Sequence, residues 1–246
     1  MSTAPSGRET PRPLESAHAP QLSTAIEVTP RTAYLRFGKP AIDLVVGLFA
    51  ALVTLPIVVI AAVAIWVSLG GSPLYTQRRV GRRGKQFTIF KLKTMIDDRR
   101  SDNRRRRDRR KDAREEDTDR RGEDRRTVHK SQEDPRVTRV GRFLRTWSID
   151  ELPQFWNVVE GNMSLIGPRP ELVEIVEEKY EPWQHQRHLV RPGLTGLWQI
   201  SERSADALMY ERTELDLEYV QTLSLKTDLT ILIKTVPAVL GLHQGH

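Results

Sequence analysis

The longest apolar stretch of the chain runs from Ala41 to Leu69 and carries one charged residue, Asp43. As a helix it would be about 43 Å long, whereas the hydrocarbon core of a bilayer is about 30 Å thick. Pro56 lies near its middle, where a proline would kink the helix and leave two arms of about 20 Å. The stretch lies too far along the chain for a cleaved signal peptide. This pattern predicts a membrane helix rather than a core helix.

Two membrane arrangements suit this stretch. It is either a single tilted transmembrane helix that tolerates Pro56, or a re-entrant helix that bends there and returns to the same face. Basic residues stay on the cytoplasmic side, and here they flank both ends. They are Arg31, Arg36 and Lys39 before the stretch, and Arg78, Arg79, Arg82, Arg83 and Lys85 after it. These flanks favour the re-entrant helix, which leaves the two arrangements about evenly supported by the residues alone.

Shorter patterns follow the apolar stretch. Residues 74–95 alternate loosely around a basic turn bracketed by Gly81 and Gly84, which predicts a short β-hairpin. The glycines are weak evidence for a phosphate loop because no helix start follows them, and a turn beside an anionic membrane surface is the better interpretation. Helical spacing predicts one helix over 137–144 and another beginning near Gln154. Residues 161–170 predict a short buried strand that leads into a stiff loop.

The C-terminal part is predicted to be helical. Residues 171–180 and 205–220 have helical period, and a second apolar stretch covers 223–242. Its charges Lys226, Asp228 and Lys234 argue against a membrane span and favour a helix in the membrane interface, with a helix packed on the core as the alternative. His185 and His188 have a spacing that can bind metal, but no third ligand is evident, which favours ordinary histidines.

Composition isolates two segments from the folded part. Residues 97–126 hold 14 Arg or Lys and 11 Asp or Glu, with Ala113 as the one apolar residue, so they cannot bury a face. They are predicted to be a solvated insertion, although their arginines could bind anionic lipid or nucleic acid. Residues 1–30 are rich in Pro, Ser, Thr and Ala and predict a disordered leader. The absence of cysteine excludes disulfides, thiolate metal sites and a cysteine nucleophile.

The candidate chemistry is the adjacent acidic pair Asp150-Glu151, between Arg145 and the tract Gly167-Pro168-Arg169-Pro170. One carboxylate can attack a phosphate while its neighbour holds a divalent cation, and arginine forks bind the anionic substrate. The two prolines fix the backbone around Arg169. A capping box between Ser148 and Glu151 is a rival explanation for Glu151 alone.

The chain from Phe37 to about Leu240 resembles the bacterial sugar transferase family, the monotopic phosphoglycosyl transferases. The matching blocks are Ser72-Pro73-Leu74-Tyr75-Thr76-Gln77, Gly81 and Gly84, Phe90-Lys91-Leu92-Lys93-Thr94-Met95, Asp134-Pro135-Arg136, Gly141-Arg142-Phe143-Leu144-Arg145, Asp150-Glu151-Leu152-Pro153-Gln154, Asn157-Val158, Met163-Ser164-Leu165-Ile166-Gly167-Pro168-Arg169-Pro170 and Arg191-Pro192-Gly193-Leu194-Thr195-Gly196-Leu197-Trp198-Gln199. So many ordered blocks make the resemblance specific.

The resemblance implies that a sugar 1-phosphate passes from a UDP-sugar to polyprenyl (undecaprenyl) phosphate, with release of UMP. Asp150 would be the nucleophile that forms a covalent phosphosugar intermediate, and Glu151 would hold Mg²⁺. Arg145 and Arg169 would contact phosphate oxygens, with Lys91 and Arg191 as further basic residues near the substrate. Cations around a dianionic phosphoryl group make physical sense.

The implied fold is α/β, mostly helical and membrane-associated, with a re-entrant helix kinked at Pro56, a small catalytic core with a short β-hairpin, and amphipathic interfacial helices. The expected segments are a leader (1–35), the membrane helix (36–71), the catalytic core (72–96 and 133–222), the charged insertion (97–132) and an interfacial helix with a tail (223–246). The resemblance places the enzyme at the bacterial inner membrane, facing the cytoplasm, as a minimal catalytic unit that starts the assembly of a polysaccharide, such as an exopolysaccharide, or of a glycoconjugate.

Two departures from the family pattern stand out. Lys93 replaces the usual arginine and loses the bidentate fork, so it is left out of the candidate site. The insertion is longer than the link in most small members. The alternatives are a membrane-anchored protein that binds anionic lipid or nucleic acid through this insertion, and a catalytically inactive scaffold in a glycan assembly complex.

Overall fold

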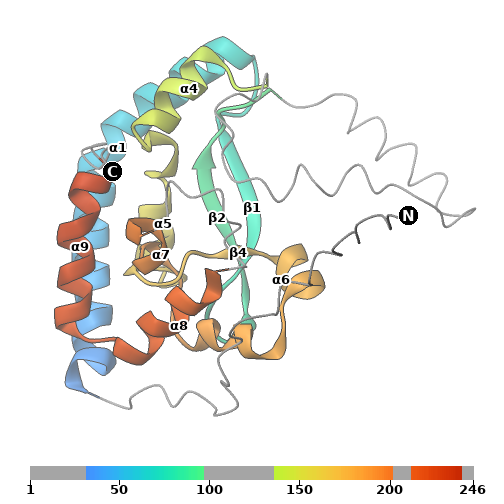
Figure 1. The fold of residues 1–246 in the computed structure, drawn as a ribbon. Helices are drawn as coiled ribbons and strands as arrows, with labels where there is room; N and C mark the ends of the chain where they lie inside the picture. The colour runs from blue at the N-terminus through green and yellow to red at the C-terminus, as the bar shows by residue number, and fades with distance from the viewer. Residues whose placement is uncertain (1–31, 97–135, 202–211, 240–246) are drawn as a thin grey trace, which may run out of the picture.

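The computed structural model describes residues 32–96, 136–201 and 212–239. Its elements are η1 (Tyr34–Gly38), α1 (Lys39–Leu69), β1 (Leu74–Val80), η2 (Arg82–Gly84), β2 (Gln86–Leu92), α4 (Arg139–Thr146), η3 (Ile149–Glu151), α5 (Gln154–Val159), β3 (Ser164–Ile166), β4 (Glu171–Leu172), α6 (Val173–Lys179), η4 (Pro182–Leu189), β5 (Gly193–Thr195), α7 (Leu197–Ser201), α8 (Thr213–Thr222) and α9 (Leu225–Val239). The described part is mostly helical with small sheets, as the sequence predicts (Figure 1). The predicted insertion and most of the predicted leader lie outside the described residues.

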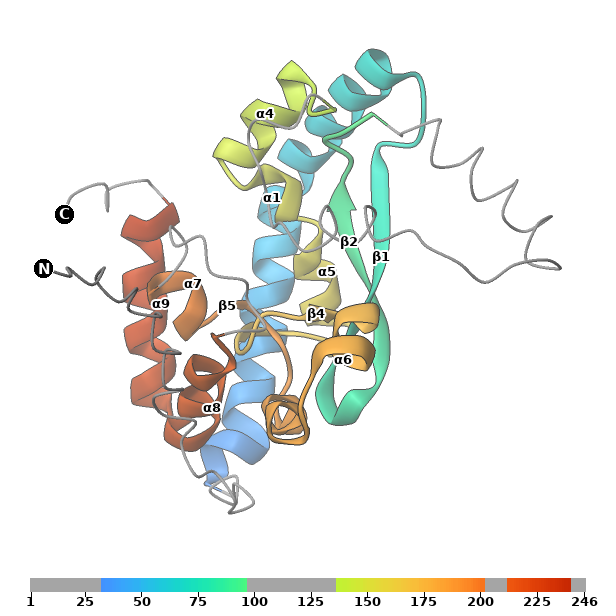
Figure 2. The ribbon, with the colours of Figure 1, turned by 45° about the vertical axis from the view of Figure 1, so that its right-hand side comes forward.

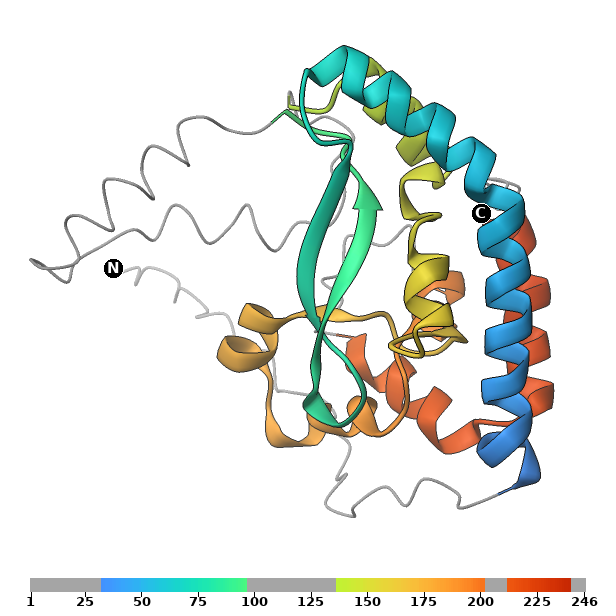
Figure 3. The ribbon, with the colours of Figure 1, turned by 180° about the vertical axis from the view of Figure 1, so that it is seen from behind.

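The membrane segment predicted from the apolar stretch forms one continuous helix that contains Pro56. Most of its large apolar side chains are exposed, Phe49, Ile60 and Val67 among them. Among the described residues, this helix is the one long and apolar enough to cross a membrane. Figure 3 shows its axis changing direction along its length. Exposed apolar side chains along most of a helix this long indicate that the protein associates with a membrane.

The hairpin predicted from the alternating pattern is present, with β1 antiparallel to β2 and Leu74 opposite Leu92. Strand β4 pairs with the other edge of β1, which gives the order β2-β1-β4. The predicted buried strand is β3, and it pairs in parallel with β5. Figure 2 shows α1 between α9 and the hairpin, with α5 beside the hairpin. The hairpin therefore runs along the side of the protein that faces away from α9.

Apolar contacts attach both halves of α1 to the rest of the protein. In its second half, Ala61 and Ile65 pack in one buried cluster with Leu92 of β2 and Leu144 of α4. In its first half, α1 approaches α5 so closely that a Cβ added at Gly47 would stand 2.8 Å from a methyl carbon of Val158. The helix is therefore docked along the catalytic core as well as exposed to its surroundings.

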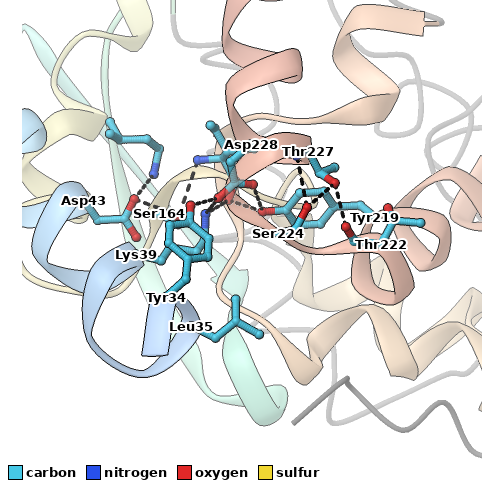
Figure 4. A network of polar contacts seen from close by, with 12 residues as sticks. Tyr34, Leu35, Lys39, Asp43, Ser164, Tyr219, Thr222, Ser224, Thr227 and Asp228 are labelled. Atoms are coloured by element: carbon cyan, nitrogen blue, oxygen red, sulfur yellow. Dashed lines mark hydrogen bonds and ion pairs between the residues drawn. The ribbon is translucent and has the colours of Figure 1, made fainter. Parts of the chain in front are cut away.

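A buried polar network ties the start of α1 to the C-terminal helices (Figure 4). Asp228 of α9 accepts hydrogen bonds from Tyr34, at 2.5 Å, and from Tyr219, at 2.7 Å, and pairs with Lys39 at 2.6 Å. Lys39 and Tyr219 both also donate to the carbonyl oxygen of Ile166, each at 3.0 Å. Three parts of the chain that are distant in sequence thus meet where β3 ends.

A second residue of the membrane helix also contacts this strand. Asp43 accepts from the hydroxyl of Ser164 and from the amide of Leu165, each at 3.0 Å. This pairing accounts for the single charge within the apolar stretch, because a buried carboxylate needs hydrogen-bond donors. It also fixes β3, and therefore the loop that follows it, relative to the membrane helix.

Helix α9 packs on the core, which was the alternative to a helix lying in the membrane interface. Asp228 and Ile231 are buried against the core, whereas Leu229, Leu232 and Ile233 are exposed. The helix therefore packs on the core with one face and presents an apolar second face.

Candidate active site

The acidic pair lies in a single 3₁₀ turn, η3, between α4 and α5. The turn follows Ser148, which has φ 53° and is one of two described non-glycine residues with positive φ. A serine in the left-handed region costs about 1 kcal/mol or more, and such strain is concentrated at functional sites. Asp150 is buried, with 4% of its surface exposed. The turn thus places one carboxylate inside the protein and its neighbour beside the hairpin.

Glu151 lies between two basic side chains. Its Oε1 accepts from Nζ of Lys91 at 3.1 Å and from Nη2 of Arg169 at 3.0 Å. All three side chains are mostly buried, so these pairs are stronger than ion pairs on an open surface. The Ser148 side chain makes no capping hydrogen bond, and its amide donates to the carbonyl of Arg145. The contacts of Glu151 therefore favour a role at the site over the capping box.

The charge on Arg169 is fixed by its acidic neighbours. Glu151, by charge and by hydrogen bond, raises the pKa of Arg169 against the opposing effect of burial, and Glu171 and Asp150 add to the rise. The guanidinium therefore stays protonated and lies close enough to both members of the pair to interact electrostatically. The phosphate-contact role expected of Arg169 stays a prediction.

Two buried arginines hold the backbone that directly follows the Arg169 side chain. Arg187 donates to the carbonyl of Arg169 at 2.5 Å, and Arg79 donates to the carbonyl of Pro170 at 3.2 Å. Arg79 also pairs with buried Glu171 at 3.7 Å. The two prolines stiffen this loop locally, as the sequence predicts, and the two arginines fix its position in space.

Arg187 itself is 1% exposed and pairs with Asp216 of α8 at 2.6 Å. It also donates a short hydrogen bond to the hydroxyl of Tyr180. Burial lowers the pKa of Arg187, but Asp216, Tyr180 and Glu171 outweigh it, so the net pKa is raised and the side chain stays charged. Sequence reasoning missed Arg79, Arg187 and Asp216. No local pattern identifies an arginine whose partners lie in other helices and strands.

Arg145 lies in the last turn of α4, which precedes the turn that carries the acidic pair. Its Nε donates to the hydroxyl of Thr94, which follows β2, at 2.8 Å. This contact needs α4 to pass very close to the backbone of Thr94. A Cβ added at Gly141 would stand 2.0 Å from the Thr94 carbonyl oxygen, so the position requires glycine.

Asn157 connects the helix after the pair to the hairpin that carries Lys91. Its Oδ1 accepts from the amide of Phe90 at 3.1 Å, and its Nδ2 donates to the carbonyl of Thr88 at 2.7 Å. The side chain is completely buried. Asn157 thus pairs with an edge of β2 as a neighbouring strand would, and it sets the spacing between Lys91 and the turn. Its part in this geometry was not predicted.

An apolar groove of about 350 Å³ adjoins the pair. Leu152 and Pro153, the two residues after Glu151, form one wall with Trp156. The other lining residues are Ala51, Thr54, Leu55, Val58, Leu74 and Phe90. The groove therefore runs from the middle of the membrane helix, where Pro56 lies, to the residues next to the acidic pair.

The other predicted residues lie away from the pair. Arg191 lines a different cavity, at the turn of the hairpin. His185 and His188 face each other with ring centroids 5.9 Å apart. In the described ranges no group of three or more His, Asp or Glu side chains is arranged to hold a metal by itself.

The donor set of the acidic pair suits Mg²⁺. This cation prefers carboxylate oxygens, keeps several waters and is commonly held by one or two carboxylates together with substrate phosphates. Asp150 and Glu151 are adjacent carboxylates of this kind. A full protein cage is not needed, so the absence of a larger acidic cluster in the described residues is compatible with such a site.

Comparison with known proteins gives a consistent result. Residues 34–242 match the family described as bacterial sugar transferase. The exopolysaccharide production protein ExoY of Sinorhizobium fredii is 37% identical over 224 residues, which cover 88% of this chain and 93% of that protein.

Two further relatives are named for their activity. The UDP-glucose:undecaprenyl-phosphate glucose-1-phosphate transferase of Caulobacter vibrioides is 37% identical over 86% of this chain and 72% of its own length. The undecaprenyl-phosphate galactose phosphotransferase of Salmonella typhimurium is 35% identical over 83% of this chain but 41% of its own length. Some relatives are thus matched over nearly their whole length and others over about two-fifths of it.

Proposed function

The chain belongs to the bacterial sugar transferase family, and from that premise we propose that it transfers a sugar 1-phosphate from a UDP-sugar to undecaprenyl phosphate, releasing UMP. The names of relatives that act on undecaprenyl phosphate support this activity. Relatives named for exopolysaccharide production support a place at the start of polysaccharide assembly. The enzyme is a polyprenyl-phosphate sugar-1-phosphate transferase.

Asp150 is the nucleophile of the proposed reaction. Its carboxylate oxygen forms a bond to the β-phosphorus of the UDP-sugar while the bond from that phosphorus to the bridging oxygen breaks. The electron pair of that bond leaves with UMP, and the phosphosugar stays on Asp150. An oxygen of undecaprenyl phosphate then bonds to the same phosphorus and restores the free carboxylate. Splitting one displacement into two is the usual advantage of covalent catalysis.

The basic side chains around Glu151 bind the diphosphate. Lys91 and Arg169 both pair with Oε1 of Glu151. A phosphate bound next to the acidic pair would therefore lie close to both cations. Arg145, held by Thr94, adds a third cation at the start of the turn. Guanidinium groups bind phosphate oxygens in pairs and stabilise the charge that builds up as the bridging bond breaks.

Glu151 is the residue that would hold Mg²⁺, with Asp150 beside it. When bound, the cation spreads the negative charge of the diphosphate and lets a carboxylate approach it. Lys91 and Arg169, which pair with Glu151, would contact the phosphate oxygens of the diphosphate. In the absence of substrate both cations pair with the Glu151 carboxylate, which offsets part of their positive charge.

The apolar groove beside the pair supports a lipid acceptor. Its walls come from the membrane helix on one side and from Leu152, Pro153 and Trp156 on the other. Burial of an isoprenoid chain is favourable by about 0.8 kcal/mol of free energy for each methylene removed from water, so such a groove would bind the chain. The phosphate end of the acceptor would then lie next to Asp150.

The membrane helix is re-entrant in this proposal, with both ends on the cytoplasmic face of the inner membrane. Basic residues on both flanks and Pro56 inside the helix support this topology. The start of the helix pairs with Asp228 and its end packs on β2 and α4, so both ends contact one catalytic core. A straight span would require that core to lie on both sides of the bilayer.

One observation carries the proposal: a buried Asp150 beside a Glu151 that is held by Lys91 and Arg169, next to an apolar groove on the membrane helix. The test is to incubate the purified protein with Mg²⁺, undecaprenyl phosphate and a panel of UDP-sugars and to follow UMP release. UMP should appear with at least one sugar and should require both Mg²⁺ and the lipid for continued turnover. No UMP from any sugar would overturn the proposal.

The topology has its own test, which the lack of cysteine makes simple. Single cysteines at Thr32 and Ser72, on either side of the membrane helix, should both react with an impermeant maleimide from the cytoplasmic side of inverted vesicles. Reaction of the two positions from opposite sides would show a transmembrane span instead. Pro56→Leu is the informative companion, because a straightened helix should move the Ser72 position to the other side.

A further inference from the structure

The turn of the hairpin carries a second basic cavity, away from the acidic pair. It holds about 300 Å³ and is lined by Gly81, Arg82, Arg83, Lys85, Gln86, Phe87, Gly161, Asn162 and Arg191. Four of these nine residues are cationic, and none is acidic. Lys91 and Gln86 lie at opposite ends of β2, five residues apart, which is about 17 Å along a strand. The cavity is therefore separate from the catalytic pair.

The cations of this cavity gather without acidic partners. Among the ion pairs of the described residues, none involves Arg82, Arg83, Lys85 or Arg191, whereas Lys91 and Arg169 share Glu151. The nearest acid in sequence, Glu160, accepts from Asn162 at 2.9 Å and does not line the cavity. Like charges repel, so a cluster of this kind is most stable when a bound anion neutralises it.

A backbone contact and the local conformation of the turn position two of these cations. Nε of Arg82 donates to the carbonyl of Leu189 at 3.3 Å, which ties the turn to η4. Arg83 takes φ 57°, one of two described non-glycine residues with positive φ. Burial, then Arg83 and Arg191, lowers the pKa of Arg82, so the three guanidinium groups are near enough to repel one another.

Arg191 reaches the cavity from the opposite side. A Cβ added at Gly161, which has φ 73°, would stand 3.8 Å from Nη2 of Arg191. A glycine here leaves the guanidinium room to lie across the backbone. Side chains from the hairpin turn and from the loop before β5 thus face one space, with Phe87 as an apolar wall.

We infer that this cavity is a second phosphate-binding site, which holds a phosphate group between the arginines of the hairpin turn and Arg191. Paired N–H groups of arginine match phosphate oxygens, and the lysine adds a point charge. The phosphate could belong to a soluble compound or to the headgroup of an anionic lipid, and both present the same chemistry to the cavity. The site does not depend on the proposed catalytic mechanism.

Local chemical protection tests the site with the whole protein. The full-length chain in neutral detergent is treated with phenylglyoxal, and modification at each arginine is followed by peptide mass spectrometry. Inorganic phosphate should slow modification of Arg83 and Arg191 about threefold relative to chloride of equal ionic strength, which corresponds to about two-thirds occupancy. Arg78, exposed on β1, should change little. Equal slowing at Arg78 and Arg191 would show general screening and overturn the inference.

A second arm distinguishes the sources of phosphate. The protein is reconstituted in phosphatidylcholine vesicles with and without phosphatidylglycerol, and the same arginines are followed. Protection by inorganic phosphate supports a soluble ligand, and protection that requires phosphatidylglycerol supports a lipid headgroup. Protection in neither arm overturns the site.

A variant confirms that the protection comes from this cavity. Lys85→Gln should reduce the protection at Arg191 at least about twofold, because it removes one of four cations around the anion. Lys179→Gln, an exposed lysine at the end of α6, is the matched control and should leave the protection unchanged. If phosphate protects Arg191 equally in both variants, the cavity does not bind phosphate.

Discussion

The two ends of the β1–β2 hairpin carry basic side chains in different surroundings. At the end near the membrane helix, Lys91 shares Glu151 with Arg169, and buried Asp150 lies alongside. At the turn, Arg82, Arg83, Lys85 and Arg191 line a cavity without an acid. Both ends thus present cations. Acidic side chains balance them at one end, and no acid lines the cavity at the other end.

The difference shows what each end still requires from a ligand. At the acid-paired end the protein supplies both signs of charge, so Glu151 holds Lys91 and Arg169 in place without a ligand. At the acid-free end the negative charge must come from outside. Charge removal should therefore reduce turnover at the first end and anion binding at the second.

The largest expected effect is from Asp150→Asn. The amide keeps the shape of the side chain but cannot form the proposed phosphosugar bond, so UMP release should fall by about 10³-fold or more. The measurement is UMP formation with saturating UDP-sugar and undecaprenyl phosphate. Turnover equal to that of the parent would show that another group is the nucleophile, and an unchanged melting temperature shows that the variant is folded.

Arg187→Met should have the next largest effect, on stability. It leaves Asp216 buried without its partner and frees the Arg169 carbonyl, which should cost about 3–5 kcal/mol in unfolding free energy. Chemical denaturation in detergent measures this change in unfolding free energy. The double variant Arg187→Met/Asp216→Leu should recover a large part of the loss, because it removes the uncompensated charge. A cost below about 1 kcal/mol would show that the pair does not hold the Arg169 loop.

Lys91→Met tests the acid-paired end directly. Removing one of the two cations on Glu151 should lower UMP release about 10²-fold, since one less positive charge faces the diphosphate. Lys179→Met, at an exposed position, makes the same change far from any described site and should turn over like the parent. Equal rates for the two variants would remove Lys91 from the site.

Local sequence patterns predicted the helices and strands, whereas the arrangement of the candidate site depends on tertiary contacts. The apolar run and the alternating residues indicated α1, the hairpin and β3, because each depends on the period of its own side chains. The capping box failed as an explanation of Glu151 because Lys91 and Arg169, distant in sequence, bind its carboxylate instead. A local motif competes with partners that the sequence does not reveal.

The placement of Arg191 illustrates the same limit. The family resemblance implied a role near the substrate, which stays a prediction, and the structure places its side chain by Gly161, where it lines the cavity at the hairpin turn. The buried pair of Arg187 and Asp216 joins two helices with no shared pattern. Such contacts depend on how the elements pack, so periodicity and spacing could not predict them.

The smallest expected effect concerns His188, in the helix that packs against the acid-free end. Burial first, then Arg187 and His185, lowers the pKa of His188 from 6.5 to about 3. The folded protein therefore keeps this ring neutral at pH 5, whereas the unfolded chain protonates it below pH 6.5. Because the unfolded state binds the extra proton, stability falls as the pH drops through this window.

The expected loss from His188 between pH 7 and pH 5 is about 2 kcal/mol, since each pH unit below the unfolded pKa costs about 1.4 kcal/mol. His188→Gln should remove this part of the pH dependence, measured by denaturation at both pH values. His185→Gln changes an exposed neighbour and should keep most of it. If His188→Gln retained the full slope, the acid sensitivity would arise elsewhere, and burial beside Arg187 would not be what keeps this histidine neutral.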